Sequence, residues 1–224
     1  MNTKTRTLLL FMATALAPLW SQATIWRVNS TPGFSSYPGT LQQCILDPNV
    51  DDGDTLHVES SAVGYGAIVC NRPLVFIGPG YRIGNTANDN TDLQHHQLTA
   101  TLTSLELQNS AIGTRVYGLR FTGILEVNCS DVTIQGNLFD TNGRLRFAGS
   151  PNTFTDILIR NNYFDSAFGI EKFGSTQTYS SVEIVNNIFV TTRIDLDGGQ
   201  VTSMTIANNV FYATSGGNLN WCAV

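Results

Sequence analysis

Apolar and polar residues alternate along four segments of the chain that share one pattern. In each segment aliphatic residues occupy alternate positions, two corner residues follow, and the segment ends in Phe. The four segments are 132–139, 157–164, 182–189 and 204–211, and a fainter copy occupies 115–121. Alternation with a period of two predicts β-strands, and a strand that returns after 18 to 25 residues predicts a solenoid.

Equivalent positions of these segments carry equivalent residues when the segments are aligned on a central aliphatic residue. That column is Val116, Ile134, Ile159, Ile184 and Ile206. Two positions later come Gly118, Gly136, Asn161, Asn186 and Asn208, which tolerate positive φ and therefore predict a corner. Next come Asn137, Asn162, Asn187 and Asn209, and coils about 4.8 Å apart would let their amides form a ladder. The last column is Phe121, Phe139, Phe164, Phe189 and Phe211, which predicts an inward aromatic stack.

This combination of strand, tight Asn corner and aromatic residue resembles the right-handed parallel β-helix of secreted bacterial repeat proteins, the pectin-lyase-like superfamily. The resemblance extends from about Gly53 to the C-terminus. It implies an all-β, right-handed parallel β-helix, and the residues that precede it are expected to add a short N-terminal helical cap. It implies little about function, because one fold can carry many unrelated sites.

A second strand is predicted between each Phe and the next aliphatic column. Its inward column is Leu125, Leu145, Ile170, Ile194 and Leu219, and its neighbours face outward because side chains alternate along a strand. The outward positions hold most of the charge in this part of the chain, which makes them the candidate ligand-binding residues: Glu126, Arg144, Arg146, Glu171, Arg193, Asp195 and Asp197. By the resemblance, this strand lines the saccharide cleft of the family's enzymes. The alternative interpretation is a solvated sheet stabilised by neighbouring opposite charges.

The N-terminal part of the chain divides into two predicted regions. Residues 1–23 have a basic start, an apolar stretch and small residues at the end, which is typical of a signal peptide. Residues 24–54 are expected to form a cap that includes a short helix at 40–46. Residues 55–224 are expected to form the β-helix, and we expect this solenoid to be incomplete at its C-terminus and to continue in a longer protein.

Composition limits the partners of the exported protein. Loss of Lys4 and Arg6 with the signal peptide changes the formal net charge from −5 to −7, which leaves no basic surface for nucleic acid. No other membrane segment is expected, so the protein is expected to be extracellular or on the cell surface, with the periplasm as the alternative. Export also suggests disulfides among the four Cys residues, with Cys44–Cys70 as the candidate bond. Cys129 and Cys222 are expected to be four coils, or about 19 Å, apart and therefore not bonded.

Two stretches invite a metal-binding interpretation, and both fit it poorly. Residues 47–54 place Asp47, Asn49 and Asp51 like the first ligands of a calcium loop, but the Gly and final Glu are missing. His95 and His96 lie in a polar insertion at 81–101, and adjacent residues on a strand face opposite ways. We expect no cofactor and no metal, with calcium at 47–54 as the alternative.

The leading functional hypothesis is a non-catalytic scaffold or adhesin-like module that binds polysaccharide or a cell-surface glycan through the charged sheet. The alternative is a polysaccharide lyase or glycoside hydrolase that acts on an acidic glycan. The resemblance implies three Asp residues and a Gly-His-Gly motif in polygalacturonases, and Asp195-Leu-Asp197 echoes only part of that set. We therefore expect no catalytic residues.

Overall fold

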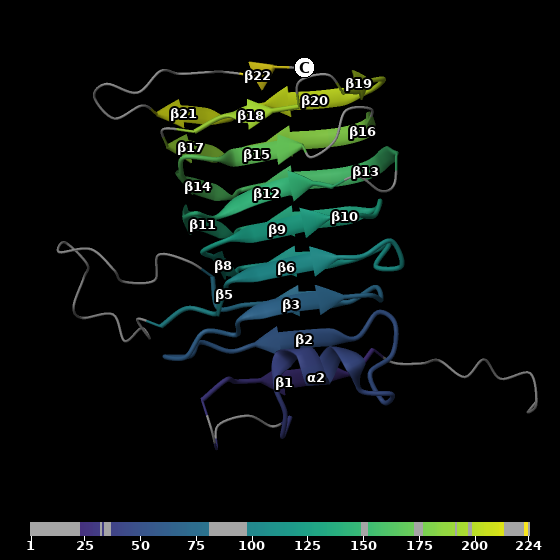
Figure 1. Cartoon of the computed structure of the whole chain (residues 1–224), viewed down its shortest axis with the longest axis vertical. Coiled ribbons are helices and arrows are strands. Elements are labelled where there is room, and N and C mark those ends of the chain that lie inside the picture. Colours follow the sequence, from purple (N-terminus) through teal and green to yellow (C-terminus); the bar gives the residue numbers. More distant parts are fainter. Residues whose placement is uncertain are drawn as a thin grey trace, which may run out of the picture.

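Three parallel β-sheets run the length of the molecule and meet at the corners of each coil. The computed structural model describes residues 23–31, 33, 37–80, 98–148, 152–172, 177–190, 192–196, 199–212 and 222–223. Most coils contribute one strand to each sheet, and successive coils stack along the long axis (Figure 1). The chain is a right-handed parallel β-helix, as the repeated segments predict.

The three sheets are named A, B and C. Sheet A contains β1 (Ile25–Val28), β2 (Thr55–Val58), β4 (Val75–Ile77), β7 (Arg115–Tyr117), β10 (Val132–Gln135), β13 (Thr153–Arg160), β16 (Thr178–Val185), β19 (Gln200–Val201) and β20 (Met204–Ala207). Sheet B contains β3 (Ala67–Cys70), β6 (Ser104–Leu107), β9 (Ile124–Val127), β12 (Arg144–Phe147), β15 (Gly169–Lys172), β18 (Ile194–Asp195) and β22 (Cys222–Ala223). Sheet C contains β5 (Thr101–Leu102), β8 (Arg120–Phe121), β11 (Leu138–Thr141), β14 (Tyr163–Ser166), β17 (Ile188–Val190) and β21 (Val210–Tyr212).

The predicted register of sheet A is confirmed. Ile134 pairs with Val116 on one side and Ile159 on the other, and the column continues through Ile184 to Ile206. The first four members of this column are fully buried. Their burial between the sheets supplies the hydrophobic free energy that holds successive coils together.

The Asn ladder is confirmed as a buried hydrogen-bonded column. Each side-chain Nδ2 donates to the Oδ1 of the Asn one coil further on. The three bonds run from Asn137 to Asn162 (3.1 Å), from Asn162 to Asn187 (3.0 Å) and from Asn187 to Asn209 (3.0 Å). The residue before each ladder Asn has positive φ, at Gly136, Asn161, Asn186 and Asn208. Gly and Asn are therefore required there by the left-handed corner, and the following Asn satisfies buried backbone groups.

The Phe column is confirmed as a continuous ring stack. The rings of Phe121, Phe139, Phe164, Phe189 and Phe211 lie 4.6 to 5.1 Å apart between centroids and within 16° of parallel. A parallel sheet sets this spacing, since the strands that carry the rings are one coil apart.

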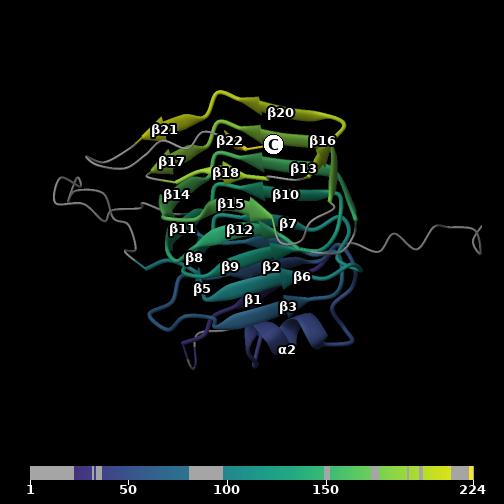
Figure 2. The ribbon, with the colours of Figure 1, turned by 45° about the horizontal axis from the view of Figure 1, so that its top comes forward.

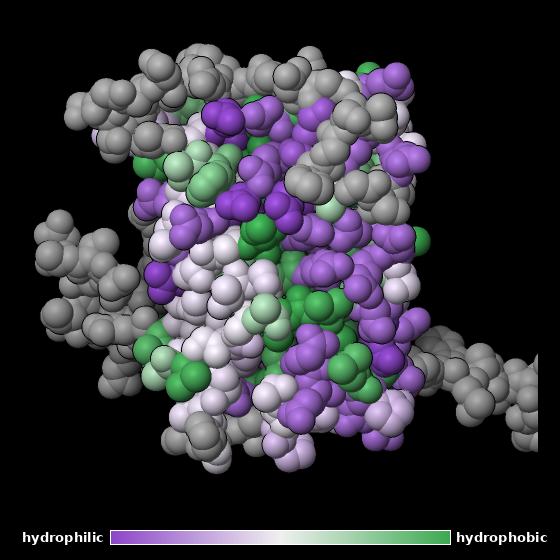
Figure 3. All heavy atoms as spheres, viewed as in Figure 1, coloured by the Kyte–Doolittle hydropathy of each residue, from purple (hydrophilic) through white to green (hydrophobic). Residues whose placement is uncertain are grey.

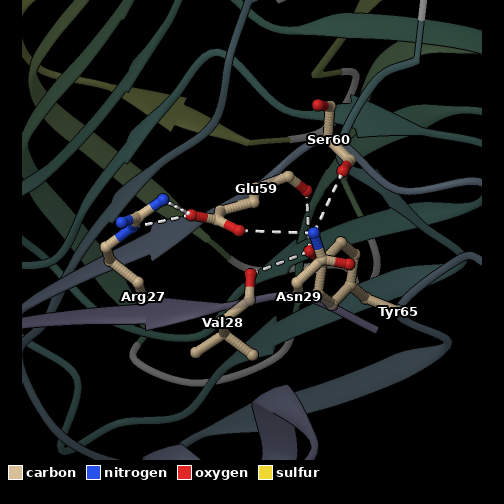
Figure 4. Close-up of polar contacts among 6 residues, drawn as sticks. All are labelled: Arg27, Val28, Asn29, Glu59, Ser60 and Tyr65. Atoms are coloured by element: carbon tan, nitrogen blue, oxygen red, sulfur yellow. Dashed lines mark hydrogen bonds and ion pairs between the residues drawn. The ribbon is translucent and has the colours of Figure 1, made fainter. Parts of the chain in front are cut away.

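The β-helix begins earlier than the sequence indicated. The stretch expected to precede the coils contains β1, which pairs with β2 in register from Ile25–Thr55 to Val28–Val58. The Tyr65 hydroxyl links β1 to the segment that follows β2, because it lies within hydrogen-bond distance of the Val28 carbonyl (2.9 Å) and of the Glu59 carbonyl (2.6 Å) (Figure 4). Arg27 Nε donates to Glu59 across the two coils at 2.7 Å. The predicted boundary at residue 54 is therefore wrong. The sequence did not reveal β1, because this strand is short and lacks the Asn and Phe that mark later coils.

The predicted signal peptide lies outside the described residues except for Ala23.

The predicted short helix is present as α2 (Leu41–Leu46). Thr40 and Gln43 form a reciprocal capping box at its N-terminus, and its buried face is Leu41, Cys44 and Ile45. The helix lies against β1 and β3 at the N-terminal end of the stack (Figure 2). The Gln42 carboxamide accepts from the Val69 N–H (2.7 Å) and donates to the Val69 carbonyl (3.0 Å). Since β3 is the edge strand of sheet B, Gln42 satisfies backbone groups that would otherwise face an approaching strand.

The predicted register of sheet B holds through β18 and is wrong in β22. Leu125, Leu145, Ile170 and Ile194 form one inward column, but the residue paired with Ile194 is Cys222 instead of Leu219. The error is three residues, because no Asn and Phe motif follows 204–211 to fix the next alignment.

The predicted Cys44–Cys70 disulfide is wrong. Cys44, Cys70 and Cys129 are buried free thiols. β22, which contains Cys222, lies four strands from β9 in sheet B, as the expected separation of Cys129 and Cys222 requires. Burial raises the pKa of the Cys44 and Cys129 thiols to about 12 and that of Cys70 to about 11. These side chains take hydrophobic positions in the core, where the thiol is the favoured form.

These three thiols are expected to be unreactive in the folded protein, because only the thiolate attacks and at pH 8 no more than about one in a thousand would be ionised. Titration of a Cys222→Ser variant with an aromatic disulfide reagent should find no reactive thiol in buffer and three in denaturant. Two missing thiols in denaturant would reveal a disulfide and contradict the structure.

Candidate functional site

Charged side chains form a column along the outer face of sheet B. In register, Glu106 is followed by Glu126, Arg146, Glu171 and Asp195, one from each successive strand from β6 to β18. Arg144 and Arg193 flank the column. Figure 3 views this face and shows hydrophilic residues gathered over β12 and β15. The backbone therefore brings together six of the seven predicted site residues, and Asp197 lies outside the described residues.

The charges of this column are paired with one another. Arg146 Nε donates to Glu126 at 3.1 Å, Arg144 Nε lies 2.6 Å from Glu171, and Arg193 Nη2 lies 3.0 Å from Asp195. The side chains of these pairs are between 21 and 49% exposed, so solvent screens each interaction. The pairs hold the side chains in place and leave the arginines with carboxylate partners.

Glu106 is a member of the column that the sequence analysis did not select. It pairs in register with Glu126, and it forms no ion pair with any described residue. The amide of Gln108 lies 3.4 Å from Glu106, and the amide of Asn128 lies 3.3 Å from Glu126, so both coils repeat one arrangement. A depression of about 450 Å³ lies over this part of sheet B, lined by Glu106, Gln108, Asn109, Ser110, Glu126 and Asn128.

An exposed aromatic ring also borders the column. Phe168, which precedes β15, is 37% exposed, and the Arg144 guanidinium carbon lies 4.5 Å from its ring centroid. This distance fits a cation–π contact. The sequence contains no signal for it, because Phe168 lies between the repeated positions.

The loop at 47–54 is organised by hydrogen bonds within the protein. Asp47 accepts from the Asn49 amides and the Tyr37 hydroxyl. Asp54 is buried and accepts from the backbone N–H groups of Thr24 (2.6 Å) and Asp51 (3.0 Å) and from the Trp26 indole (2.8 Å). Of the two carboxylates proposed for calcium, Asp47 therefore accepts from protein donors, and Asp51 takes part through its backbone N–H.

Acid should weaken the attachment of β1 through Asp54. Burial alone would raise the pKa of this carboxyl, but the hydrogen bonds from Trp26, Thr24 and Asp51 outweigh it and the pKa is lowered. Its stabilising contribution is therefore complete above the unfolded pKa of about 4 and is lost as the pH falls through the lower folded pKa. The Asp54→Asn substitution should lower the free energy of unfolding by about 2 to 3 kcal/mol at pH 7. Denaturant unfolding from pH 7 to pH 2 should show that the difference in free energy of unfolding between the native protein and the variant becomes smaller below pH 4. A difference in stability that is constant with pH would contradict this role of Asp54.

The described residues contain no group of three or more His, Cys, Asp or Glu placed to hold a metal ion. The His95–His96 pair of the metal hypothesis lies outside the described ranges. Among the described residues, no helix is long and apolar enough to cross a membrane.

Comparison of the chain with protein-family models, with curated proteins and with solved structures finds no match. The resemblance to the pectin-lyase-like superfamily therefore stays a prediction beyond the β-helix architecture itself.

Proposed function

We propose that the protein is a secreted, non-catalytic β-helix scaffold that binds polysaccharide along the outer face of sheet B. The observation that carries the proposal is the column from Glu106 to Asp195, whose members repeat at the spacing of the coils. A polymer with regularly repeated hydroxyl groups can meet such a column at several coils at once. Weak contacts that act together in this way give useful affinity.

The ion pairs favour a neutral glycan over an acidic one. Each arginine of the column has a carboxylate partner, and Glu106 adds a negative charge without an arginine partner of its own. A uronate polymer would have to displace those carboxylates and approach Glu106. The depression at Glu106 and Glu126 instead offers carboxylates, which accept hydrogen bonds from sugar hydroxyls, and amides, which can both donate to them and accept from them.

A glycan array that contains neutral and acidic polymers tests the proposal. The native protein should bind neutral glycans, and a Glu106→Gln, Glu126→Gln double variant should lose most of that binding. The matched control is Glu183→Gln, which removes an exposed carboxylate from the outer face of sheet A and should bind normally. Binding of no glycan, or equal loss in the control, would contradict the proposal.

The enzyme alternative has its own readout. Incubation with polygalacturonate and alginate, with and without calcium, should release neither unsaturated products nor new reducing ends. Product formation that disappears in Asp195→Ala would establish a polysaccharide-cleaving enzyme in place of the scaffold.

A further inference from the structure

The polar column on the outer face of sheet B has a defined length. Its five members are, in register, Glu106, Glu126, Arg146, Glu171 and Asp195. The next residue in register is Val69 on the N-terminal side and Ala223 on the C-terminal side, and neither side chain has a hydrogen-bonding group. The column therefore offers polar side chains over five consecutive coils, from β6 to β18.

The coils that carry this column are evenly spaced. The rings of the Phe column, which belong to the same stack of coils, lie 4.6 to 5.1 Å apart between neighbouring centroids. The strands of sheet B lie one above another along the long axis (Figure 1), so the members of the polar column recur at a similar spacing. A polymer that meets all five must repeat its own groups at nearly this distance.

The linkage between pyranose rings determines how far each sugar advances a glycan chain. A β-1,4 linkage through equatorial bonds leaves the ring at opposite ends, so the chain is extended. Each sugar then advances it by nearly the length of one ring, which is close to the separation of neighbouring strands. A β-1,3 linkage leaves from the side of the ring and an α-1,4 linkage starts from an axial bond, so these chains coil and advance less. The extended chain is therefore the one that stays in step with the coils.

We propose that the ligand is a neutral polysaccharide joined through equatorial β-1,4 bonds, and that it lies along the long axis with one sugar at each coil. This inference rests on the proposed function and adds to it the linkage and the direction of the chain. The first two coils each combine a carboxylate with an amide, Glu106 with Gln108 at 3.4 Å and Glu126 with Asn128 at 3.3 Å. Each such pair can accept from and donate to the hydroxyl groups of one sugar.

The affinity should rise with chain length up to five sugars. Each added sugar reaches a further coil and should raise the association constant by about two- to tenfold, which is the effect of one ordinary hydrogen bond. A sixth sugar meets Val69 or Ala223 and should add little. Frontal affinity chromatography of the full chain with β-1,4-linked oligomers of two to six sugars measures this dependence.

A double variant at one end of the column tests whether each coil holds one sugar. Glu106→Ala, Gln108→Ala removes both polar side chains of the first coil, so the fifth sugar should no longer raise the affinity, while the increases up to the fourth remain. The control is Glu183→Ala, which removes an exposed carboxylate from the outer face of sheet A and should keep the increase through five sugars.

Hexamers that differ in linkage test the geometry of the chain. The probes are β-1,4-linked hexamers of glucose, mannose and xylose, with β-1,3-linked and α-1,4-linked glucose hexamers for comparison. At least one β-1,4-linked hexamer should bind about tenfold or more tightly than either comparison, because a chain out of step with the coils reaches fewer of them.

Three results would overturn the inference. Equal or tighter binding of the β-1,3-linked or α-1,4-linked hexamer would do so, and would leave the proposed binding of neutral glycans standing. An increase that continues through five sugars in the double variant would do the same. Binding of none of the β-1,4-linked hexamers would also overturn it, and the glycan array then decides the proposed function separately.

Discussion

Replacement of Asn162 by Ala is expected to lower the free energy of unfolding by about 3 to 5 kcal/mol. The Asn162 side chain is buried in the middle of the ladder, where its Nδ2 donates to the Ile134 carbonyl at 2.9 Å. Its Oδ1 accepts from the backbone N–H of Asn137 at 2.9 Å. Alanine leaves both backbone groups buried without a partner, and each such group costs about 1 to 3 kcal/mol.

Two control variants separate the ladder from the corner. Asn161→Gly keeps the positive φ of 56° accessible and should change stability by less than about 1 kcal/mol. Asn209→Ala removes the half-buried last member of the ladder and should cost less than Asn162→Ala. Denaturant unfolding measures all three. Equal effects of Asn162→Ala and Asn161→Gly would show that the ladder contributes no special stability.

Replacement of Phe164 by Ala should destabilise the protein by a similar amount, about 3 to 5 kcal/mol. The ring is fully buried between Phe139 and Phe189, with centroid distances of 4.6 and 4.7 Å. The coils cannot move closer to fill the space, because backbone hydrogen bonds on both sides fix their separation. The loss therefore includes a cavity as well as the transferred hydrophobic surface.

Phe168→Ala is the matched control for Phe164→Ala. Both variants delete the same phenyl ring, at positions only four residues apart in the sequence. Phe168 is 37% exposed and contacts Arg144 at the surface, so its loss should cost no more than about 1 kcal/mol. Thermal or denaturant unfolding distinguishes the two. A Phe164 variant as stable as the Phe168 variant would mean that the rings do not form a packed column.

The sequence predicted those parts of the fold that repeat. Asn162 and Phe164 have counterparts in neighbouring coils, so a single alignment of the repeated segments predicts their ladder and stack. β1 and the register of β22 were missed for the same reason, because neither strand carries the repeated Asn and Phe. A four-residue strand such as Ile25–Val28 is recognisable only from its pairing with β2.

The candidate site shows a similar limit. Alternation along the strand placed Glu126, Arg146 and Glu171 on one outer face, because backbone geometry alone determines that face. Glu106 lies in a coil before the clear repeats, so the alignment did not reach it. Arg144 pairs with Glu171, which is two residues away from its own register partner Gly169, and such a diagonal contact depends on side-chain conformation.

A pair of engineered cysteines tests most directly whether the coils stack with the charged column in register. Arg146 and Glu171 are facing partners on β12 and β15, and disulfides form between Cα atoms about 4.4 to 6.8 Å apart. Under mild oxidation, the Arg146→Cys, Glu171→Cys protein should form a bond between these positions that peptide mass spectrometry detects. The Arg146→Cys, Lys172→Cys protein, shifted by one residue to the opposite face, should not. Efficient bonding in the shifted pair, or in neither, would contradict the stacked arrangement.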